Sequence, residues 1–353
     1  MATIRDVARA SNVSIATVSR VFNKSLLVSE ETRQRVVVAA TSLGYYPNGI
    51  ARSLITNRTH TLGVLLPDLH GEFFSEVIHG VDVTARERGL HLLVSRASAS
   101  AEELTEAMRT MRGRVDGLIV MAPDLDASTA LKHFTGGVPT VLLNPEVALP
   151  GCDTISIANV EGAYAVVRHL LGLGHRRIAT IMGPVRNVDA RQRLHGYRMA
   201  LRDGSIEPGP ALELRGDFTE RSGYEAALEL LRGEPRPTAV FIANDHMAVG
   251  VLGALQEAGV RVPADMAIAG FDDIRLARYL TPPLTTVHVD MLQLGQRAVQ
   301  MLLEPGHPTG PSGFRHEVLP TTLVVRGSCG SNPRNHAGGP RWDRSGATRP
   351  TQR

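Results

Sequence analysis

The sequence is poor in the residues that cross-link a chain or hold a metal. Only two of its 353 residues are cysteines, Cys152 and Cys329, and neither stands at metal-ligand spacing from another ligand residue. This pattern excludes a disulfide framework and a structural zinc site, and it is typical of a reducing compartment. Aromatic residues make up 4% of the chain against 43% hydrophobic residues, so we expect an aliphatic core. We expect no metal and no cofactor.

Long apolar runs are also missing. No stretch is long enough to span a membrane, and the opening "MATIRDVARA" is charged and lacks the apolar region of a signal peptide. We therefore expect a cytoplasmic protein, associated with the nucleoid and not with a membrane. Motifs for a nucleophile elbow, a phosphate-binding loop or a metal-spaced His/Cys cluster are absent as well, which argues against an enzyme.

The charge is distributed unevenly along the chain. Residues 1–60 hold eight basic and three acidic side chains, and residues 326–353 hold six arginines and one aspartate. Each of these ends carries +5, so residues 61–325 carry −7 of the total of +3. A basic head on an acidic body indicates that the head meets a polyanion, although chance unevenness remains the alternative.

The first 47 residues predict three short helices. Thr3 and Asp6 fit a capping box, Asn12 can take the left-handed conformation of a tight turn, and Ser14 and Ser29 can cap the second and third helices. Valines and a phenylalanine recur on the inner face of the second helix. Gly44 and Pro47 end the third helix.

Residues 48–60 predict a marginal helix or linker, since about two helical turns are unstable alone in water.

Residues 61–327 alternate aliphatic strands with amphipathic helices in two successive runs, which indicates an α/β core of two doubly wound lobes with parallel sheets. We place lobe one at about 61–160 and 291–320, and lobe two at about 161–290 and 321–327. The polar, Gly- and Arg-rich tail at 328–353 is predicted to be disordered. The predicted core helices are 73–88, 101–111, 128–135, 160–172, 190–203, 220–232 and 245–258.

The order of helix, tight turn, helix and supporting helix is that of a helix-turn-helix DNA-binding head. The start of the second helix would enter the major groove, where Ile15 and Ala16 suit a thymine methyl group and Arg20 suits guanine. Short polar groups nearby suit phosphate oxygens. A plain helical domain with a surface arginine is the alternative. The predicted polar and phosphate-contacting residues of the head are Ser14, Thr17, Ser19 and Asn23.

The chain resembles the LacI/GalR family of bacterial repressors over residues 2 to about 327. The resemblance is carried by "TIRDVARASNVSIATVSRVFN", "VSEETRQRV", "LGYYPNGIARSL", "RTHTLGVLLPD", "LGHRRIATIMGP", "RQRLHGYRMAL", "FIANDHMAVG" and "GFDDIRLARYLTPPLTTV". It implies a repressor that binds a pseudo-palindromic operator as a homodimer. It also implies that the hinge folds on DNA and places Leu54 in the minor groove, with Arg52 beside it. Ordinary linker packing is the alternative for Leu54.

The resemblance further implies a core similar to periplasmic sugar-binding proteins, with an effector site between the lobes. The residues carried over are Phe73, Phe74, Asn144, Arg193, Phe218, Asn244 and Asp272. Such side chains suit a hydroxyl-rich ligand, since they combine a forked donor, acceptors and aromatic faces. Alternatives remain: an acid could neutralise Arg193, Phe218 could belong to the core, and Asn244 or Asp272 could cap a helix.

Two positions depart from the family pattern. Many members have Asn-Pro-Phe-Phe where this chain reads "HGEFF", which brings an unusual charge, Glu72, to the mouth of the site, and Asn144 stands where relatives often have aspartate. A sugar acting as inducer is the expected effector, with a purine-like corepressor as the alternative. A cytoplasmic sugar-binding protein without a DNA role is a further alternative. The tail lacks a leucine heptad, so we expect no tetramer.

Overall fold

The computed structural model describes residues 2–22, 27–45, 58–96, 100–123, 138–146, 152–304 and 314–330. By contacts between residues, the chain divides into a unit of residues 1–60 with 113–116 and a second unit holding the rest. Within the described residues, no helix is long and apolar enough to cross a membrane. The predicted helix 128–135, most of the 48–60 segment and the tail beyond residue 330 lie outside these ranges.

The head contains three helices, α1 (Ile4–Ala10), α2 (Ile15–Phe22) and α3 (Glu30–Ser42). Small aliphatic side chains fill the space between them, and Phe22 and Tyr45 pack at its edge with ring centroids 5.8 Å apart. The core of the head consists of Val7, Ala8, Val18, Val21, Val36, Ala39 and Ala40.

Local chemistry at the helix ends confirms the sequence predictions. Thr3 and Asp6 form the capping box of α1, in which each side chain accepts from the backbone N–H of the other. The hydroxyl of Ser14 accepts from Thr17 N at 3.1 Å, and Asn12 has the left-handed φ of +50° that the turn requires. These caps hold α2 in place with only a short turn before it.

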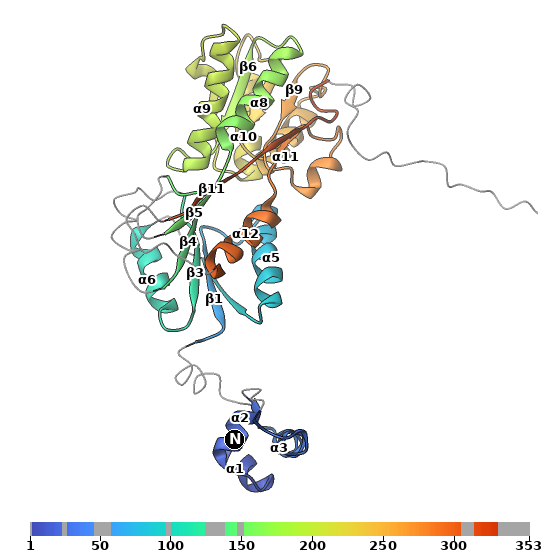
Figure 1. Cartoon of the computed structure of the whole chain (residues 1–353). Helices are drawn as coiled ribbons and strands as arrows, with labels where there is room; N and C mark the ends of the chain where they lie inside the picture. The colour runs from blue at the N-terminus through green and yellow to red at the C-terminus, as the bar shows by residue number, and fades with distance from the viewer. Residues whose placement is uncertain are drawn as a thin grey trace, which may run out of the picture. The chain divides into compact units, whose positions relative to one another are not determined.

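Lobe one is built on a six-stranded sheet with the order β11-β5-β4-β3-β1-β2, in which all pairs are parallel. Helices α5 and α12 pack together on one side of the sheet, and α6 lies on the other (Figure 1). The central strands are fully buried, as continuous apolar strands between covering helices must be. The elements are β1 (Thr61–Leu66), α5 (Glu72–Glu87), β2 (His91–Arg96), α6 (Ala101–Met111), β3 (Gly117–Met121), β4 (Thr140–Leu143), β5 (Asp153–Ile157), α12 (Met291–Leu303) and β11 (His316–Leu319).

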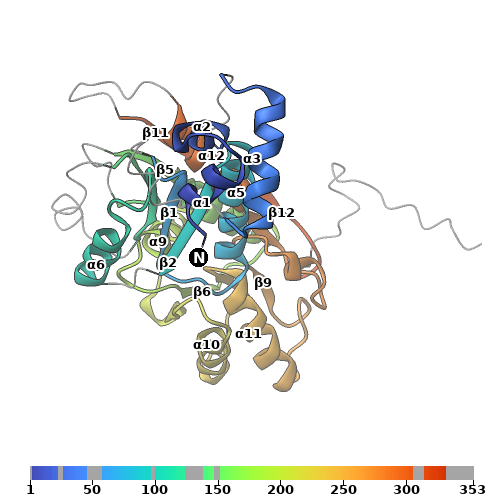
Figure 2. The same cartoon turned by 90° about the horizontal axis from the view of Figure 1, so that it is seen from below.

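Lobe two is built on a four-stranded parallel sheet with the order β7-β6-β8-β9. Helices α8 and α9 pack against each other, and so do α10 and α11, which lie side by side in Figure 2. The elements are α8 (Asn159–Gly172), β6 (Ile178–Met182), α9 (Val188–Asp203), η1 (Pro210–Leu212), β7 (Glu213–Arg215), α10 (Glu220–Arg232), β8 (Ala239–Ile242), α11 (Asp245–Glu257), β9 (Ala267–Ala269) and η2 (Arg275–Arg278).

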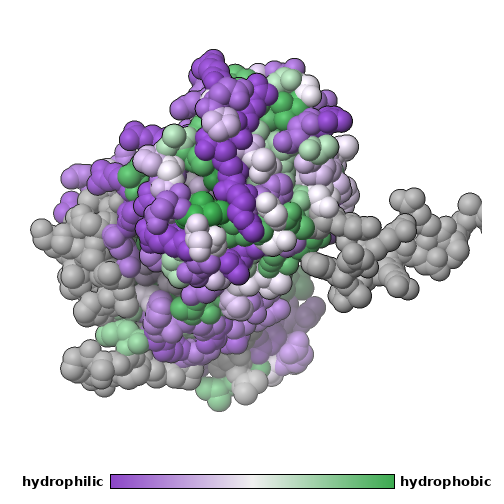
Figure 3. Space-filling view, turned by 90° about the horizontal axis from the view of Figure 1, so that it is seen from above, coloured by the Kyte–Doolittle hydropathy of each residue, from purple (hydrophilic) through white to green (hydrophobic). Residues whose placement is uncertain are grey.

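Three chain crossings join the lobes. The chain passes from β5 into α8, from β10 (Thr286–His288) into α12, and from β11 into β12 (Thr322–Val324), and β10 and β12 pair antiparallel. The face of the molecule seen from above is mostly hydrophilic, with apolar residues in small separate patches (Figure 3). The predicted core helices that fall in the described ranges are confirmed to within two residues at either end, and the doubly wound parallel architecture is confirmed with them.

Helices α5 and α12 approach closely because each has a glycine at the contact. A Cβ on Gly80 would lie 2.1 Å from the carbonyl oxygen of Leu292, and a Cβ on Gly295 would lie 2.2 Å from that of Val77. Neither backbone oxygen can move without displacing its helix. The contact therefore tolerates no side chain.

We expect Gly80→Ala to destabilise lobe one by about 1–3 kcal/mol, because the new methyl group forces the two helices apart. Thermal unfolding followed by circular dichroism should show a lower midpoint. Gly253→Ala is the matched control. This glycine lies inside α11 with only an ordinary 4.0 Å contact, to Tyr224, so alanine should stabilise the helix by about 0.4–1 kcal/mol. Equal midpoints for the two variants would contradict the close-contact argument.

Candidate functional site

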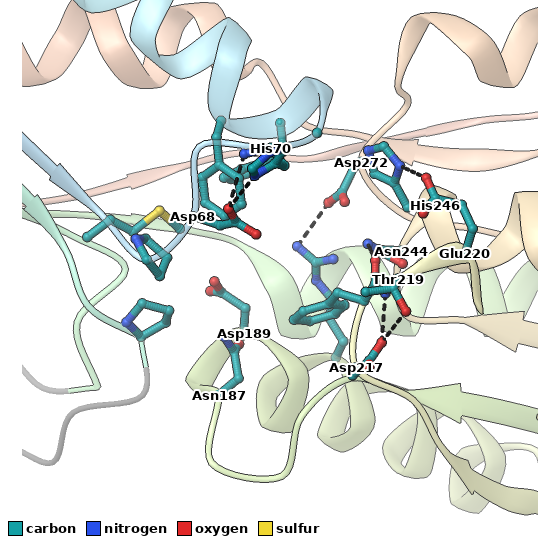
Figure 4. Close-up of a pocket in the computed structure, with 18 residues that line it drawn as sticks. Asp68, His70, Asn187, Asp189, Asp217, Thr219, Glu220, Asn244, His246 and Asp272 are labelled. Carbon is teal, nitrogen blue, oxygen red and sulfur yellow. Dashed lines mark hydrogen bonds and ion pairs between the residues drawn. The ribbon is translucent and has the colours of Figure 1, made fainter. Parts of the chain in front are cut away.

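A cavity of about 270 Å³ lies between the two lobes. Lobe one lines it with residues that follow β1 and β3, and lobe two with residues that follow β6, β7, β8 and β9 (Figure 4). The carboxyl ends of both parallel sheets therefore face the same space, which is where open α/β sheets bind ligands. The lining residues are Pro67, Asp68, His70, Gly71, Phe73, Phe74, Met121, Pro123, Asn187, Asp189, Arg193, Asp217, Phe218, Thr219, Glu220, Asn244, His246 and Asp272.

Arg193, on α9, is buried in the floor of this cavity with its guanidinium fixed on several sides. Its Nε donates to Asn159 Oδ1 at 2.8 Å and its Nη1 to the carbonyl oxygen of Ala243 at 2.6 Å. The guanidinium carbon stacks 3.8 Å from the ring centroid of Phe271, and Nη2 lies 3.0 Å from Asp272 Oδ1. A guanidinium held in this way is pre-organised, because little side-chain entropy remains to be lost on binding.

Asp272 stands in a strained loop directly after β9. Asp272 and Asp273 have φ values of +106° and +56°, which side chains other than glycine rarely adopt. The fully buried Asp245 holds this loop: its carboxylate accepts from Ile274 N at 3.1 Å and from the Thr286 hydroxyl at 2.7 Å. The backbone N–H of Asp272 donates to the carbonyl oxygen of Val287 at 2.8 Å. The strain is thus balanced by surrounding hydrogen bonds that aim Asp272 into the cavity.

The carboxylate of Asp272 is incompletely satisfied. Oδ1 forms the ion pair with Arg193 but accepts no hydrogen bond of good geometry from the described residues, although the side chain is only 5% exposed. Burial raises the pKa of Asp272 to about 6, and the Arg193 charge only partly opposes this rise. An orphaned acceptor of this kind is costly, and a hydroxyl group from a ligand would satisfy it.

A polar chain runs from Asp189 to Arg193. Asp189 accepts from the side-chain amides of Asn159 at 2.8 Å and Asn144 at 3.3 Å, and Asn159 in turn accepts from Arg193. Asn144 also accepts from Ile157 N and does not line the cavity. The contact of Asn144 with the effector stays a prediction. Asn144 directly follows β4 and lies outside the cavity lining, where its side-chain amide orients Asp189 by donating to the carboxylate.

The remaining predicted residues line the cavity. Phe73 and Phe74 stand edge to face at the start of α5, with ring centroids 5.4 Å apart. Phe218 has a positive φ of 73° that turns its ring towards Arg193, 6.0 Å away. Asn244 caps α11 by accepting from Met247 N, and its amide donates to the carbonyl oxygen of Phe218. The helix-cap alternative for Asn244 is therefore correct, and the same side chain still faces the cavity.

Most of the acidic lining was missed from the sequence. Burial raises the pKa of the Asp68 carboxyl, but hydrogen bonds from His70 and Leu69 outweigh it, so the pKa lies below its usual value. The pKa of Asp217 is likewise lowered, because hydrogen bonds from Thr219 and Ser222 outweigh burial. Asp68 and Asp217 each follow the end of a predicted strand within two residues, and this position could have identified them as cavity residues from the sequence. With Asp189, Glu220 and Asp272 they give five carboxyl groups around a single arginine.

In the head, most of the face of α2 that was predicted to read DNA is exposed. Ser14, Ile15, Ala16 and Arg20 are exposed, Thr17 and Ser19 are half-buried, and Val18 and Val21 point into the core. Asn23, Arg52 and Leu54 lie outside the described residues. Among the residues that the structure describes, no group of three or more His, Cys, Asp or Glu side chains could hold a metal ion.

Replacing the buried Asp272 should change how stability depends on pH. Because the folded pKa is raised to about 6 from 3.8, its stabilising contribution is complete below 3.8 and is lost as the pH rises to about 6. We expect Asp272→Asn to gain about 2 kcal/mol in free energy of unfolding relative to wild type between pH 4.5 and pH 7, at about 1.4 kcal/mol per pH unit. Urea unfolding at the two pH values measures this difference.

Asp273→Asn provides the control from the same loop. Burial alone would raise the pKa of Asp273, but hydrogen bonds from His288 and Arg326 bring it below its usual value. Asp273 is ionised in both states over this range, but its carboxylate also raises the pKa of His288. The comparison is therefore made between pH 4.5 and pH 5.5, where His288 is protonated in both states and the stability difference of Asp273→Asn from wild type should stay constant. A constant difference for Asp272→Asn as well would show that Asp272 titrates normally.

Residues 3–48 match the family described as "Bacterial regulatory proteins, lacI family", and residues 167–329 match the "Periplasmic binding protein-like domain". The chain is 39% identical over 305 residues to the ribose operon repressor of Escherichia coli strain K12, covering 86% of this chain and 92% of that protein. It is 37% identical over 309 residues to the transcriptional repressor PurR of Haemophilus influenzae strain PittEE, covering 86% and 91%.

Solved structures of the same family are similar to this chain over most of its length. The lac repressor dimer bound to operator and the anti-inducer ONPF has a TM-score of 0.85 at 33% identity, covering 93% of this chain and 99% of that chain. A LacI family regulator from Enterococcus faecium with bound ribose has a TM-score of 0.67 at 28% identity, covering 76% and 98%. The chain is therefore a member of the LacI family of bacterial regulatory proteins, a regulator of transcription and not an enzyme.

Proposed function

We propose that this protein is a repressor that binds a pseudo-palindromic operator as a homodimer through its helix-turn-helix head. Support comes from the exposed start of α2, with Ile15, Ala16 and Arg20 clear of the core, and from the operator-bound lac repressor dimer among similar structures. Thr17, Ser19, Asn23 and Arg52 contact the phosphate backbone, and Leu54 enters the minor groove between the two hinges. The dimer does not assemble into a tetramer, and it acts in the cytoplasm on the nucleoid.

The cleft between the lobes binds the effector, and the effector is a neutral, hydroxyl-rich sugar that acts as inducer. The observation that carries this proposal is the buried Arg193–Asp272 pair with its unsatisfied carboxylate oxygen. Sugar hydroxyls both donate and accept, so one hydroxyl satisfies Asp272 while its neighbour accepts from Arg193. Phe73, Phe74 and Phe218 supply apolar faces for the sugar ring, and Asn244 adds an amide.

The charge and the volume of the cavity restrict the class of ligand that it can bind. Five carboxyl groups surround one arginine that is already paired, so phosphorylated sugars and nucleotides are repelled. The cavity of about 270 Å³ lies just below the range of roughly 300–1,000 Å³ usual for ligand pockets, which favours a monosaccharide over a disaccharide. A purine-like corepressor is the second candidate, because aromatic rings in the cavity lining can pack against a flat base and PurR is among the relatives.

We expect Arg20→Ala to abolish specific operator binding while the head stays folded. The bidentate contact of an arginine with guanine contributes about 1–3 kcal/mol per base pair, and a dimer loses it in both half-sites. Selection on randomised DNA duplexes identifies the operator, and titration of the winning sequence measures the loss. Arg9→Ala, on the exposed face of α1, removes the same charge outside the reading helix and should retain most of the specificity. Unchanged operator affinity in Arg20→Ala would remove this residue from the reading role.

We expect sugar affinity to fall as the pH drops below about 6, because protonation of Asp272 removes the acceptor for the sugar hydroxyl. Calorimetry with neutral pentoses and hexoses, D-ribose first, measures this between pH 5 and pH 8. Asp272→Asn should weaken binding at least about tenfold at pH 7.5 and flatten the pH profile, while operator binding without sugar is retained. A retained response in this variant would place the effector elsewhere.

A further inference from the structure

The unusual "HGEFF" segment of lobe one is engaged by lobe two at the mouth of the cleft. The N–H of Glu72, the first residue of α5, donates to Nε2 of His246 on α11 at 3.4 Å. Among the described residues, no side chain of lobe one caps α5, so an acceptor from the other lobe serves a backbone donor of this helix end. The Glu220 carboxylate, 2.7 Å from Nδ1 of His246, holds the proton on Nδ1 and leaves Nε2 as the acceptor (Figure 4).

The reverse contact runs from lobe one to lobe two. Oε1 of Glu72 accepts from the backbone N–H of Arg275 at 2.5 Å, at the start of the 3-10 helix η2. The Arg275 guanidinium reaches back to Glu72, with Nε 3.7 Å from Oε1, and forms a second ion pair with Glu76 one turn along α5. The side chains of Glu72 and Glu76 are only 23% and 21% exposed, respectively. Each lobe therefore caps a helix end of the other.

Gly71 is the residue that lets the lobes approach this closely. It has a φ of +86°, and a Cβ at this position would lie 3.2 Å from Nε2 of His246. The clasp is also adjacent to ligand-facing residues on both lobes. Glu72 directly precedes Phe73, and Arg275 follows Asp272 by three residues on the same strained loop.

We propose that Glu72, His246 and Arg275 form a clasp that holds the lobes closed over the cleft and thereby sets the affinity for the effector. This inference rests on the proposed function in one respect, that the effector binds in this cleft. A ligand enclosed by both lobes binds the closed form, so its apparent affinity scales with the closed fraction. By linkage, the bound effector strengthens the clasp by the same factor.

Closure is measured first without any ligand. Spin labels at Arg109→Cys on α6 and Glu229→Cys on α10, both exposed positions, report the distance between the lobes by pulsed electron paramagnetic resonance. Labelled chain is mixed with excess unlabelled chain so that each assembly carries one labelled pair. We expect Arg275→Gln and Glu72→Gln to add a longer-distance population that the unsubstituted chain lacks. Arg278→Gln removes the same charge from the other end of η2 and should leave the distances unchanged.

The second readout is calorimetry with D-ribose and the other neutral sugars at pH 7.5. We expect Arg275→Gln and Glu72→Gln to bind the sugar roughly 2- to 5-fold more weakly, as the loss of partly exposed ion pairs predicts, and Arg278→Gln to match wild type. The double variant should lose less affinity than the product of the two single losses, because both substitutions remove the shared Glu72–Arg275 ion pair. Unchanged distances would overturn the clasp even if sugars bind. Changed distances without binding of any sugar would retain the clasp and reject the sugar effector.

Discussion

The cleft depends on one buried ion pair, between Arg193 and Asp272. Their side chains are 4% and 5% exposed, so both charges have lost most of their hydration. Arg193 recovers that loss through Asn159, the carbonyl oxygen of Ala243 and the ring of Phe271. Asp272 has fewer interactions to replace its lost hydration, and burial raises its pKa to about 6. A buried pair of this kind contributes little to stability, and under the proposed function its value lies in offering a charged acceptor to a ligand.

The strained backbone that carries Asp272 is stabilised by contacts with several other residues of lobe two. The left-handed backbone at Asp272 and Asp273 persists because Asp245 binds the loop from beneath, and because Arg326 and His288 pair with Asp273. Strain of this sort survives only where its surroundings over-determine it. The same loop continues into η2, so Asp272 and the inter-lobe contact at Arg275 belong to one continuous segment. The proposed effector site and the proposed clasp are thereby joined by a single segment of the chain.

Much of the fold could be predicted from the sequence, because local rules dictate it. The capping box at Thr3, the serine cap at Ser14 and the left-handed turn at Asn12 are consequences of side chains acting on their own backbone, and all three are present. Apolar strands alternating with amphipathic helices predicted parallel sheets, and both sheets are parallel. The resemblance brought Arg193, Phe218 and Asp272 to one cavity. Asn144 lies outside the lining of that cavity, and its amide donates to Asp189.

The sequence by itself determined which helices and strands form, where they begin, the family of the chain and the residue types at the strand ends. Those features depend on neighbours within about four residues or on a periodic pattern. Only the tertiary structure decided that Asp68, Asp189 and Asp217 share one cavity, that the pKa of Asp272 is raised, and that Glu72 meets Arg275 about 200 positions away. These properties arise from burial and from contacts across the cleft, and no local pattern encodes either, because desolvation depends on everything that surrounds a group.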